Sequence, residues 1–313
     1  MVKFNNQRKD NKMKKIISTL FFIFFATSVI SAEPLVDAAW LNKNLNNKNI
    51  FVLDIRNKID GGSYEVFKKA HIPGSVHSDF LTANWRTTIN GVIGQFPGKE
   101  PLEKLVGSLG IDNSKHVIIV YGGVNSTDFG SAARIYWTFK TLGHENVSIL
   151  NGGFKSWQKS GYKVASGENV LTPKIFKASI NKKYTASYKE VKNAKKETNG
   201  VCLIDARPEA FFKGEKTHPA LKVAGRIPGA VNLQEEETIG NDGFIKSKAE
   251  ILKLYDKAQI KGFKDYITYC NTGHWAATVW FALSEVANIP GVRMYDGSWA
   301  HWEKNPNNPV IKG

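Results

Sequence analysis

The sequence has little cysteine: only Cys202 and Cys270 occur in 313 residues. Two cysteines in a chain of this length exclude a disulfide framework. The seven histidines are scattered, and no Cys/His cluster has the spacing of zinc ligands, so no metal site is predicted. We expect two free thiols, because Cys202 falls inside one predicted strand and Cys270 at the end of another, beyond disulfide reach.

The sequence also lacks arginine-rich blocks and a hydrophobic run long enough for a comfortable membrane span. Its 43 Lys and Arg against 28 Asp and Glu give a formal net charge of +15. The lysines are spread over the chain without stacking aromatics, which argues against nucleic acid and leaves an anionic surface or small anionic substrates as partners. With 42% hydrophobic residues, the chain is long enough for two domains with full cores.

The N-terminus has the pattern of a secretory signal peptide. Lysines precede an apolar run at 16–26, and small residues follow up to Ala32. We expect cleavage near Ala32, with an uncleaved anchor as the alternative, and a periplasmic or secreted monomer without stable membrane insertion. Residues 1–32 hold six of the Lys and Arg and one acid, so their removal lowers the net charge from +15 to +10.

The second half of the chain repeats the first. Four segments recur in the same order: 51–56 and 202–207, 70–76 and 225–231, 117–121 and 266–270, 151–157 and 296–302. Their order and similar offsets indicate duplicated domains. Short apolar strands alternate with helical stretches in each half, which predicts an α/β fold with a parallel sheet flanked by helices. We place the first domain at 33–165, an ordered connector at 166–183, and the second domain at 184–313.

Cys270 ends a predicted strand and opens a short loop before a helix. Ligands of parallel sheets bind beyond the carboxyl ends of the strands. The N–H groups of such a loop and the positive end of the helix stabilise a thiolate, and Gly273 permits the tight turn. The alternative is a buried cysteine that acts as a small hydrophobe, which is the interpretation of Cys202. In the first half, Tyr121 or Gly122 stands where Cys270 stands in the second.

Several motifs combine with this loop. They are the Asp-Xaa-Arg motifs at 54–56 and 205–207, the Ile-Pro-Gly turns at 72–74 and 227–229, and Tyr295-Asp296-Gly297-Ser298-Trp299. The combination resembles the rhodanese sulfurtransferases over residues 35–310. The resemblance implies that a sulfane sulfur moves from thiosulfate or 3-mercaptopyruvate to Cys270 as a persulfide, and then to cyanide or another thiophilic acceptor. It implies no metal or organic cofactor and a first domain that is inactive.

The resemblance also implies that Arg207 helps to hold the anionic donor, with an ion pair to the neighbouring Asp205 as the alternative. The active-site loop would comprise Asn271, Thr272, Gly273, His274 and Trp275. We expect the Thr272 hydroxyl to contact the donor or persulfide and Trp275 to form a pocket wall or pack between domains. His274 is expected to contribute specificity or face solvent, and not to act as a general base, because backbone donors already stabilise the thiolate.

Three other functions compete with thiosulfate sulfurtransferase activity. A phosphatase of related fold would need arginine six positions after the cysteine, where Ala276 stands. A non-catalytic sulfur carrier or binding module would use Cys270 without turnover. A 3-mercaptopyruvate sulfurtransferase would have Gly-Ser-Gly after the cysteine, whereas thiosulfate enzymes of the family tend to have basic residues there. The loop residues 271–273 match neither pattern. We expect thiosulfate, because an exported location makes it the more available donor, with positive charge supplied by lysines elsewhere in the chain.

Overall fold

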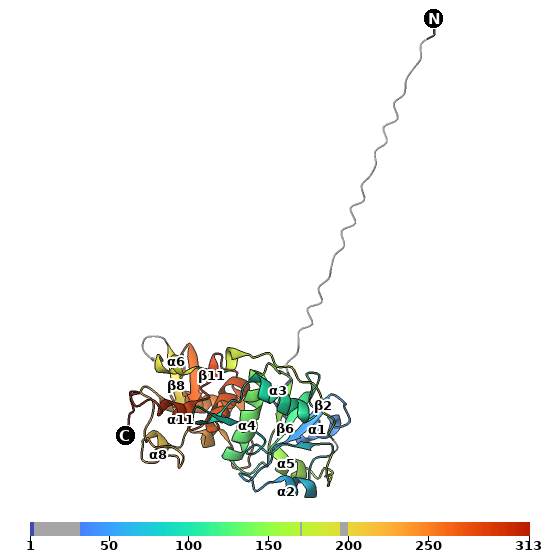
Figure 1. Ribbon diagram of the computed structural model, residues 1–313, viewed down its shortest axis with the longest axis horizontal. Helices are drawn as coiled ribbons and strands as arrows, with labels where there is room; N and C mark the ends of the chain where they lie inside the picture. The colour runs from blue at the N-terminus through green and yellow to red at the C-terminus, as the bar shows by residue number, and fades with distance from the viewer. Residues whose placement is uncertain (3–31, 170, 195–199) are drawn as a thin grey trace. The chain divides into compact units, whose positions relative to one another are not determined.

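A computed structural model describes residues 1–2, 32–169, 171–194 and 200–313 of the chain. The predicted signal peptide falls almost entirely outside these residues, so its cleavage stays a prediction. Within the described ranges, no helix is both long and apolar enough to cross a membrane. The chain divides into two units, and the larger unit, Ser31–Gly313, contains the sheets and helices (Figure 1).

The first half contains a five-stranded parallel sheet with strand order β1-β7-β6-β2-β3. Its strands are β1 (Leu35–Val36), β2 (Ile50–Asp54), β3 (Val76–His77), β6 (His116–Val120) and β7 (Val147–Leu150). The helices around it are α1 (Ala38–Asn44), α2 (Tyr64–Lys69), α3 (Lys99–Ser108), α4 (Ser126–Thr141) and α5 (Gly153–Lys159). A separate antiparallel pair is formed by β4 (Thr87–Ile89) and β5 (Val92–Gln95).

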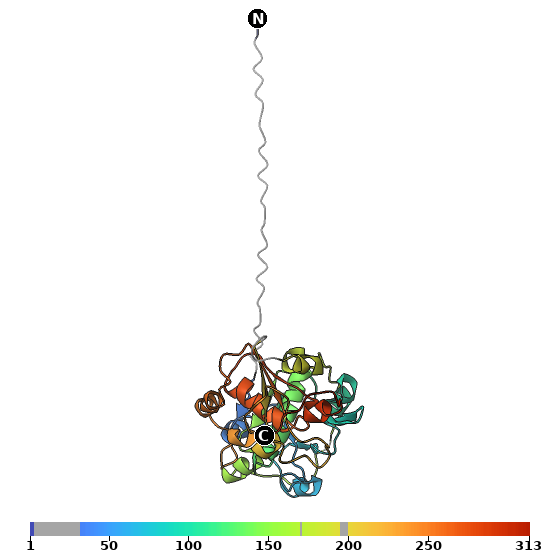
Figure 2. The same ribbon diagram turned by 90° about the vertical axis from the view of Figure 1, so that its left-hand side faces the viewer.

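The second half contains a four-stranded parallel sheet with strand order β11-β10-β8-β9. Its strands are β8 (Val201–Asp205), β9 (Val231–Asn232), β10 (Asp265–Tyr269) and β11 (Val292–Met294). The helices of this half are α6 (Tyr188–Lys192), α8 (Glu209–Phe212), α9 (Lys248–Lys257), α10 (Trp275–Phe281) and α11 (Ser298–Trp302). Short helical turns are η1 (Lys182–Tyr184), η2 (Glu235–Thr238) and η3 (Ala282–Val286). In Figure 2 this half, coloured yellow to red, faces the viewer. The predicted α/β fold with two parallel sheets is confirmed.

The apolar run of β6 explains why helices cover both faces of the first sheet. Val117 and Ile119 pack in a hydrophobic cluster that includes side chains of α3 and α4. Ile118 and Val120 pack in a second cluster with side chains of α1 and α5. Successive side chains of a strand point to opposite faces, so a continuous apolar run requires burial on both.

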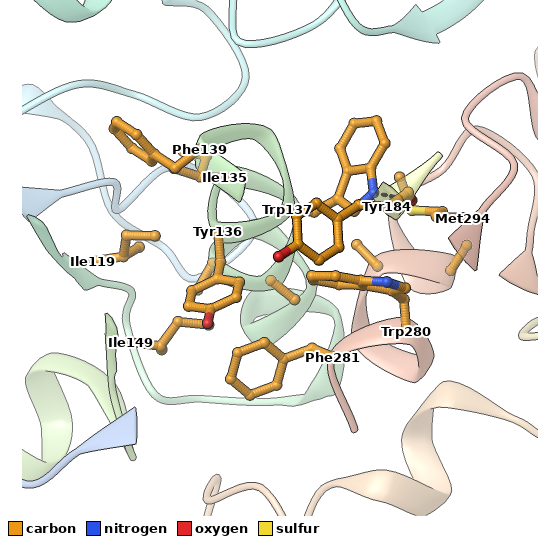
Figure 3. Packing of buried hydrophobic residues seen from close by; sticks show 14 of the residues in the cluster. Ile119, Ile135, Tyr136, Trp137, Phe139, Ile149, Tyr184, Trp280, Phe281 and Met294 are labelled. Atoms are coloured by element: carbon orange, nitrogen blue, oxygen red, sulfur yellow. Dashed lines mark hydrogen bonds between the residues drawn. The ribbon is translucent and has the colours of Figure 1, made fainter. Parts of the chain in front are cut away.

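Helices α4 and α10 join the two halves (Figure 3). The rings of Phe129 and Tyr136 on α4 meet Phe281 of α10 edge-on, with centroid distances of 5.6 and 4.9 Å. The indole N–H of Trp137 donates to the carbonyl of Tyr184 over 2.9 Å. One hydrophobic cluster contains buried residues of both halves, including Phe176 of the connector. The loop that opens α10 is therefore held against the first half of the molecule.

Candidate active site

Cys270 lies directly after β10, at the carboxyl end of the second sheet, and its side chain is buried. The N–H of Cys270 donates to the Ser298 hydroxyl over 3.1 Å. The carbonyls of Cys270 and Asn271 accept hydrogen bonds from Trp299 and Ala300, each over 2.9 Å. The first turn of α11 thus holds the start of the loop by its backbone. Both cysteines are free, as the sequence predicted.

The loop offers a run of unused backbone donors. Within the described part of the chain, no acceptor is paired with the N–H groups of residues 271–275. Gly273 has a φ of 74°, which is the left-handed conformation expected from the sequence. Successive unpaired N–H groups in a turn form the kind of concave array that binds anions. The loop can therefore stabilise a negatively charged sulfur.

The corresponding loop of the first half identifies Tyr121 as the counterpart of Cys270. Val120 pairs with Asp54 in the first sheet just as Tyr269 pairs with Asp205 in the second. The carbonyl of Tyr121 accepts a hydrogen bond from the second residue of a following helix, as Cys270 does. Of the two positions that the sequence left open, Tyr121 is thus the equivalent one.

In the first half, a carboxylate fills the array of donors. Asp128 accepts hydrogen bonds from the N–H groups of Gly122, Gly123 and Val124, over 3.2, 2.7 and 3.0 Å. Asp128 is the third residue of α4, and the third residue of α10 is Ala277. The two loops therefore differ in their chemistry: one already holds an anion of its own chain, and the other is open to an external one.

Asp128 lies beside a second buried carboxyl group, that of Asp60. Asp60 accepts hydrogen bonds from the N–H groups of Asn57 and Gly62. Burial and the charge of Asp128 nevertheless raise the pKa of Asp60 to about 7. Burial also raises the pKa of Asp128. Beside the first-half loop, the two carboxyl groups of Asp60 and Asp128 are thus more stable when they share one proton than when both are ionised.

His274 turns toward the first half. Its Nε2 lies 3.2 Å from the hydroxyl of Ser131 on α4, and its ring stacks on Phe80 at 5.2 Å. Burial, followed by the charges of Arg86 and Arg134, lowers the pKa of His274 well below its usual value. The imidazole is therefore neutral at physiological pH, and its contacts place it between the halves. That His274 does not act as a general base stays a prediction.

The other loop side chains divide between the two halves. Trp275 donates its indole N–H to the Thr127 hydroxyl over 3.1 Å and meets Phe211 edge-on at 6.0 Å. Thr272 is half-buried, and its carbonyl lies so close to Gly94 that a side chain on Gly94 would collide with it. Asn271 is buried, and among the described residues its side-chain amide has no hydrogen-bond partner.

Arg134 of α4 holds the loop from the other half, and the sequence analysis missed it. Its guanidinium donates to the Gly273 carbonyl over 3.0 Å and to the Gly94 carbonyl over 3.2 Å, and it forms an ion pair with Asp296. Asp296 also accepts from the N–H of Phe96 over 2.7 Å. The sequence signal that could have indicated this role is a single arginine within the mostly apolar stretch 129–139, because a buried arginine needs specific partners.

Arg207 forms the ion pair that the sequence offered as the alternative to donor binding. It donates to both carboxylate oxygens of Asp205, at 2.6–3.1 Å, and to the Gly225 carbonyl over 2.8 Å. Arg56 pairs in the same way with Asp54 and donates to the Ala70 carbonyl over 2.8 Å. These repeated contacts have a structural role in both halves. We therefore expect the ion pair to be the main role of Arg207, while donor binding by Arg207 stays untested.

A family model, the rhodanese-like domain, matches the chain twice, at residues 37–160 and 187–305. The chain belongs to the rhodanese family. Thiosulfate sulfurtransferase from Bos taurus is 32% identical over 240 residues, which are 75% of this chain and 78% of the bovine one. The sulfur carrier protein TtuD from Thermus thermophilus is 30% identical over 291 residues, 90% of this chain and 97% of that one.

Solved structures share the rhodanese fold. SseA from Escherichia coli, a 3-mercaptopyruvate sulfurtransferase, aligns with a TM-score of 0.74 and 29% identity over 86% of this chain and 99% of its own. The anaerobic ergothioneine biosynthesis enzyme from Chlorobium limicola has a TM-score of 0.77 over 90% of this chain and 70% of its own. At 23% identity, the second match concerns the fold alone. The protein is a two-domain rhodanese-family sulfurtransferase.

Replacing either Asp-Xaa-Arg arginine tests its role in the rhodanese fold. Because Arg56 and Arg207 make the same contacts, we expect Arg56→Lys and Arg207→Lys to lower the free energy of unfolding alike, by about 1.5–3 kcal/mol. Denaturant unfolding measures this, and kcat/KM of the folded fraction should change little in either variant. A loss of kcat/KM of about 10-fold or more in Arg207→Lys alone would instead support donor binding.

The carboxyl pair of the first rhodanese domain predicts a pH effect on stability. Asp60 loses its proton near pH 4 when unfolded and near pH 7 when folded. The contribution of Asp60 to the free energy of unfolding is therefore fully present at low pH, where its carboxyl group is protonated, and is lost as pH rises through 7. At pH 8 we expect Asp60→Asn to be more stable than the parent protein by on the order of 1–2 kcal/mol, with the difference gone below pH 4.

Urea unfolding at pH 4 and pH 8 measures that difference. Asp112→Asn is the matched control, because Asp112 is only partly buried and hydrogen bonds from Ser114 lower its pKa. Asp112→Asn should therefore not become the more stable protein at pH 8. An Asp60→Asn protein whose stability follows the parent at both pH values would contradict the proposed shared proton.

Proposed function

We propose that this rhodanese-family sulfurtransferase takes the outer sulfur of thiosulfate onto Cys270 and passes it to cyanide or another thiophilic acceptor. The Cys270 thiolate attacks the outer sulfur, a new S–S bond forms, and the S–S bond of thiosulfate breaks with release of sulfite. The electron pair of the broken bond leaves with sulfite, so the cysteine becomes a persulfide anion. Cyanide then attacks the terminal sulfur, and thiocyanate leaves while the Cys270 thiolate is restored.

One observation carries this proposal: the donors that Asp128 occupies in the first half are unoccupied around Cys270. Both the thiolate and the persulfide are anions, and fixed N–H groups stabilise such charge without reorganisation during the reaction. Ala277 stands where Asp128 stands in the first half, so at this position the chain offers no carboxylate that would compete for these donors. The buried position of Cys270 favours a small donor over a large one.

The choice of donor belongs to this proposal as well. The bovine relative supports thiosulfate, whereas SseA supports 3-mercaptopyruvate. The 3-mercaptopyruvate reaction would load the same Cys270 persulfide and release pyruvate. Comparison of kcat/KM for the two donors decides between them, and we expect thiosulfate to be preferred.

A sulfur carrier is the second candidate function, because TtuD is similar along almost the whole chain. A carrier would load Cys270 once and then require a specific protein acceptor. An enzyme would turn over thiosulfate and cyanide continuously. We propose that the reaction takes place in the periplasm or outside the cell, because residues 1–32 have the sequence pattern of a secretory signal peptide.

Substitution of each cysteine in turn tests the sulfur-carrying residue. Cys270→Ser should abolish thiocyanate formation, because serine cannot form the persulfide. Cys202→Ser should retain most of the activity, because Cys202 is buried inside β8. Intact mass after thiosulfate treatment should rise by one sulfur in the parent and in Cys202→Ser, and not in Cys270→Ser. A sulfur found on Cys202 would overturn the assignment.

Transfer of the first-half carboxylate to the second half tests the role of the open loop. Ala277→Asp places a carboxylate where Asp128 stands in the first half, and it should occupy the N–H groups of residues 271–273. We expect persulfide formation to slow by about 100-fold or more, since loss of one such donor costs 100- to 1,000-fold elsewhere. Single-turnover release of sulfite measures the rate.

Ala277→Ser is the control for this change, because its short side chain adds bulk without a negative charge. Both variants are first checked for a folded state by circular dichroism. A folded Ala277→Asp protein that releases sulfite at the rate of Ala277→Ser would show that the loop N–H groups do not stabilise the reacting sulfur.

A further inference from the structure

The cysteine loop carries no positive charge of its own, and two arginines of the first half, Arg86 and Arg134, lie beside it. Residues 270–275 contain no lysine or arginine. Arg134 contacts the loop directly, but Asp296 neutralises its charge. Arg207, which follows β8, is neutralised by Asp205. A dianionic donor therefore needs another cation.

Arg86, just before β4, is placed to be that cation. Its guanidinium carbon lies 4.6 Å from the ring centroid of Phe80, and Phe80 stacks on His274 of the loop. A second contact passes through Gly94. A Cβ built on Gly94 would lie 3.6 Å from Nη1 of Arg86 and 2.8 Å from the carbonyl of Thr272. The guanidinium and the loop thus approach the same side of Gly94.

Within the described ranges of the chain, no carboxylate or carbonyl pairs with the guanidinium of Arg86, which contacts the ring face of Phe80. The side chain is half-buried, which is a costly position for an unpaired cation. Burial, with Arg134 nearby, lowers the pKa of Arg86 to about 10, while Cys270 and Asp296 act in the opposite direction. Arg86 therefore stays protonated at neutral pH in surroundings that an anion would stabilise.

We propose that Arg86 of the first half binds the sulfonate end of the donor while its outer sulfur faces Cys270. The planar guanidinium presents paired N–H groups that match two oxygens of a sulfonate. Phe80 holds the guanidinium in place by its ring face. This inference rests on the proposed function. It means that the domain without a catalytic cysteine binds the negatively charged end of the donor.

The proposal also accounts for the neutral loop of residues 271–273. The positive charge that thiosulfate enzymes of the family tend to carry after the cysteine is here supplied across the interface between the halves. A donor bound between Arg86 and Cys270 touches both domains. The first domain would then contribute directly to donor recognition as well as to the packing of α4 against α10.

Kinetics of Arg86 variants test the proposal. We expect Arg86→Gln to raise KM for thiosulfate by about 10- to 100-fold with kcat changed less than threefold, and Arg86→Lys to fall between it and the parent. Arg226→Gln is the matched control, because Arg226 also stacks on a phenylalanine, Phe212, at 4.4 Å. It should leave KM unchanged. Thermal unfolding of each variant reports whether the fold is retained.

Calorimetry separates this inference from the proposed function. Thiosulfate is titrated into Cys270→Ser protein with and without Arg86→Gln, so that no turnover occurs, and we expect Kd to rise about 10- to 100-fold without the arginine. Absence of thiosulfate turnover in the parent protein would overturn the proposed function, while the titration still reports on Arg86. Normal turnover with an unchanged Kd and KM in Arg86→Gln would overturn the inference alone.

Discussion

The contact on which the site depends is that of Arg134 with the backbone of the cysteine loop. Its guanidinium reaches from α4 of the first half to the Gly273 carbonyl and to Asp296, both in the second half. A buried guanidinium is stable only when its donors are used, so the interface must keep this arrangement. The same helix carries the rings that pack on α10, directly after the loop. Hydrophobic packing and a directional ionic contact from one helix thus fix both the loop and the helix that follows it.

The two halves show how one fold supports an open and a closed version of the same loop. Both loops connect a buried strand to a helix, and the backbone around them is fastened in the same way. A carboxylate on the third residue of α4 closes the first loop, and alanine on the third residue of α10 leaves the second open. The closed loop is stable without a ligand because its N–H groups are satisfied. The open loop keeps its backbone N–H groups unpaired, which lowers the stability of the fold and favours the binding of an anion.

A duplicated domain without its cysteine can still be needed for the reaction. The first half supplies Ser131 and Phe80 to His274, Thr127 to Trp275, and Arg134 to the loop carbonyl. These contacts keep His274 neutral and the loop covered. The activity of the second half is therefore expected to require the first, and the shared core explains why the halves remain together.

The sequence by itself determined the duplication, the parallel α/β sheets, the free thiols and the left-handed Gly273, because these depend on local pattern and on backbone geometry. It also placed Cys270 at a strand end, where the fold rules put ligands. Only the tertiary structure decided what surrounds that cysteine. Arg134 and Arg86 lie more than a hundred residues away in the chain, and their partners depend on how two helices pack. Asp205 and Arg207 are an intermediate case. Their motif is visible in the sequence, but only the neighbouring groups in space decide whether Arg207 binds a sulfur donor or forms an ion pair with Asp205.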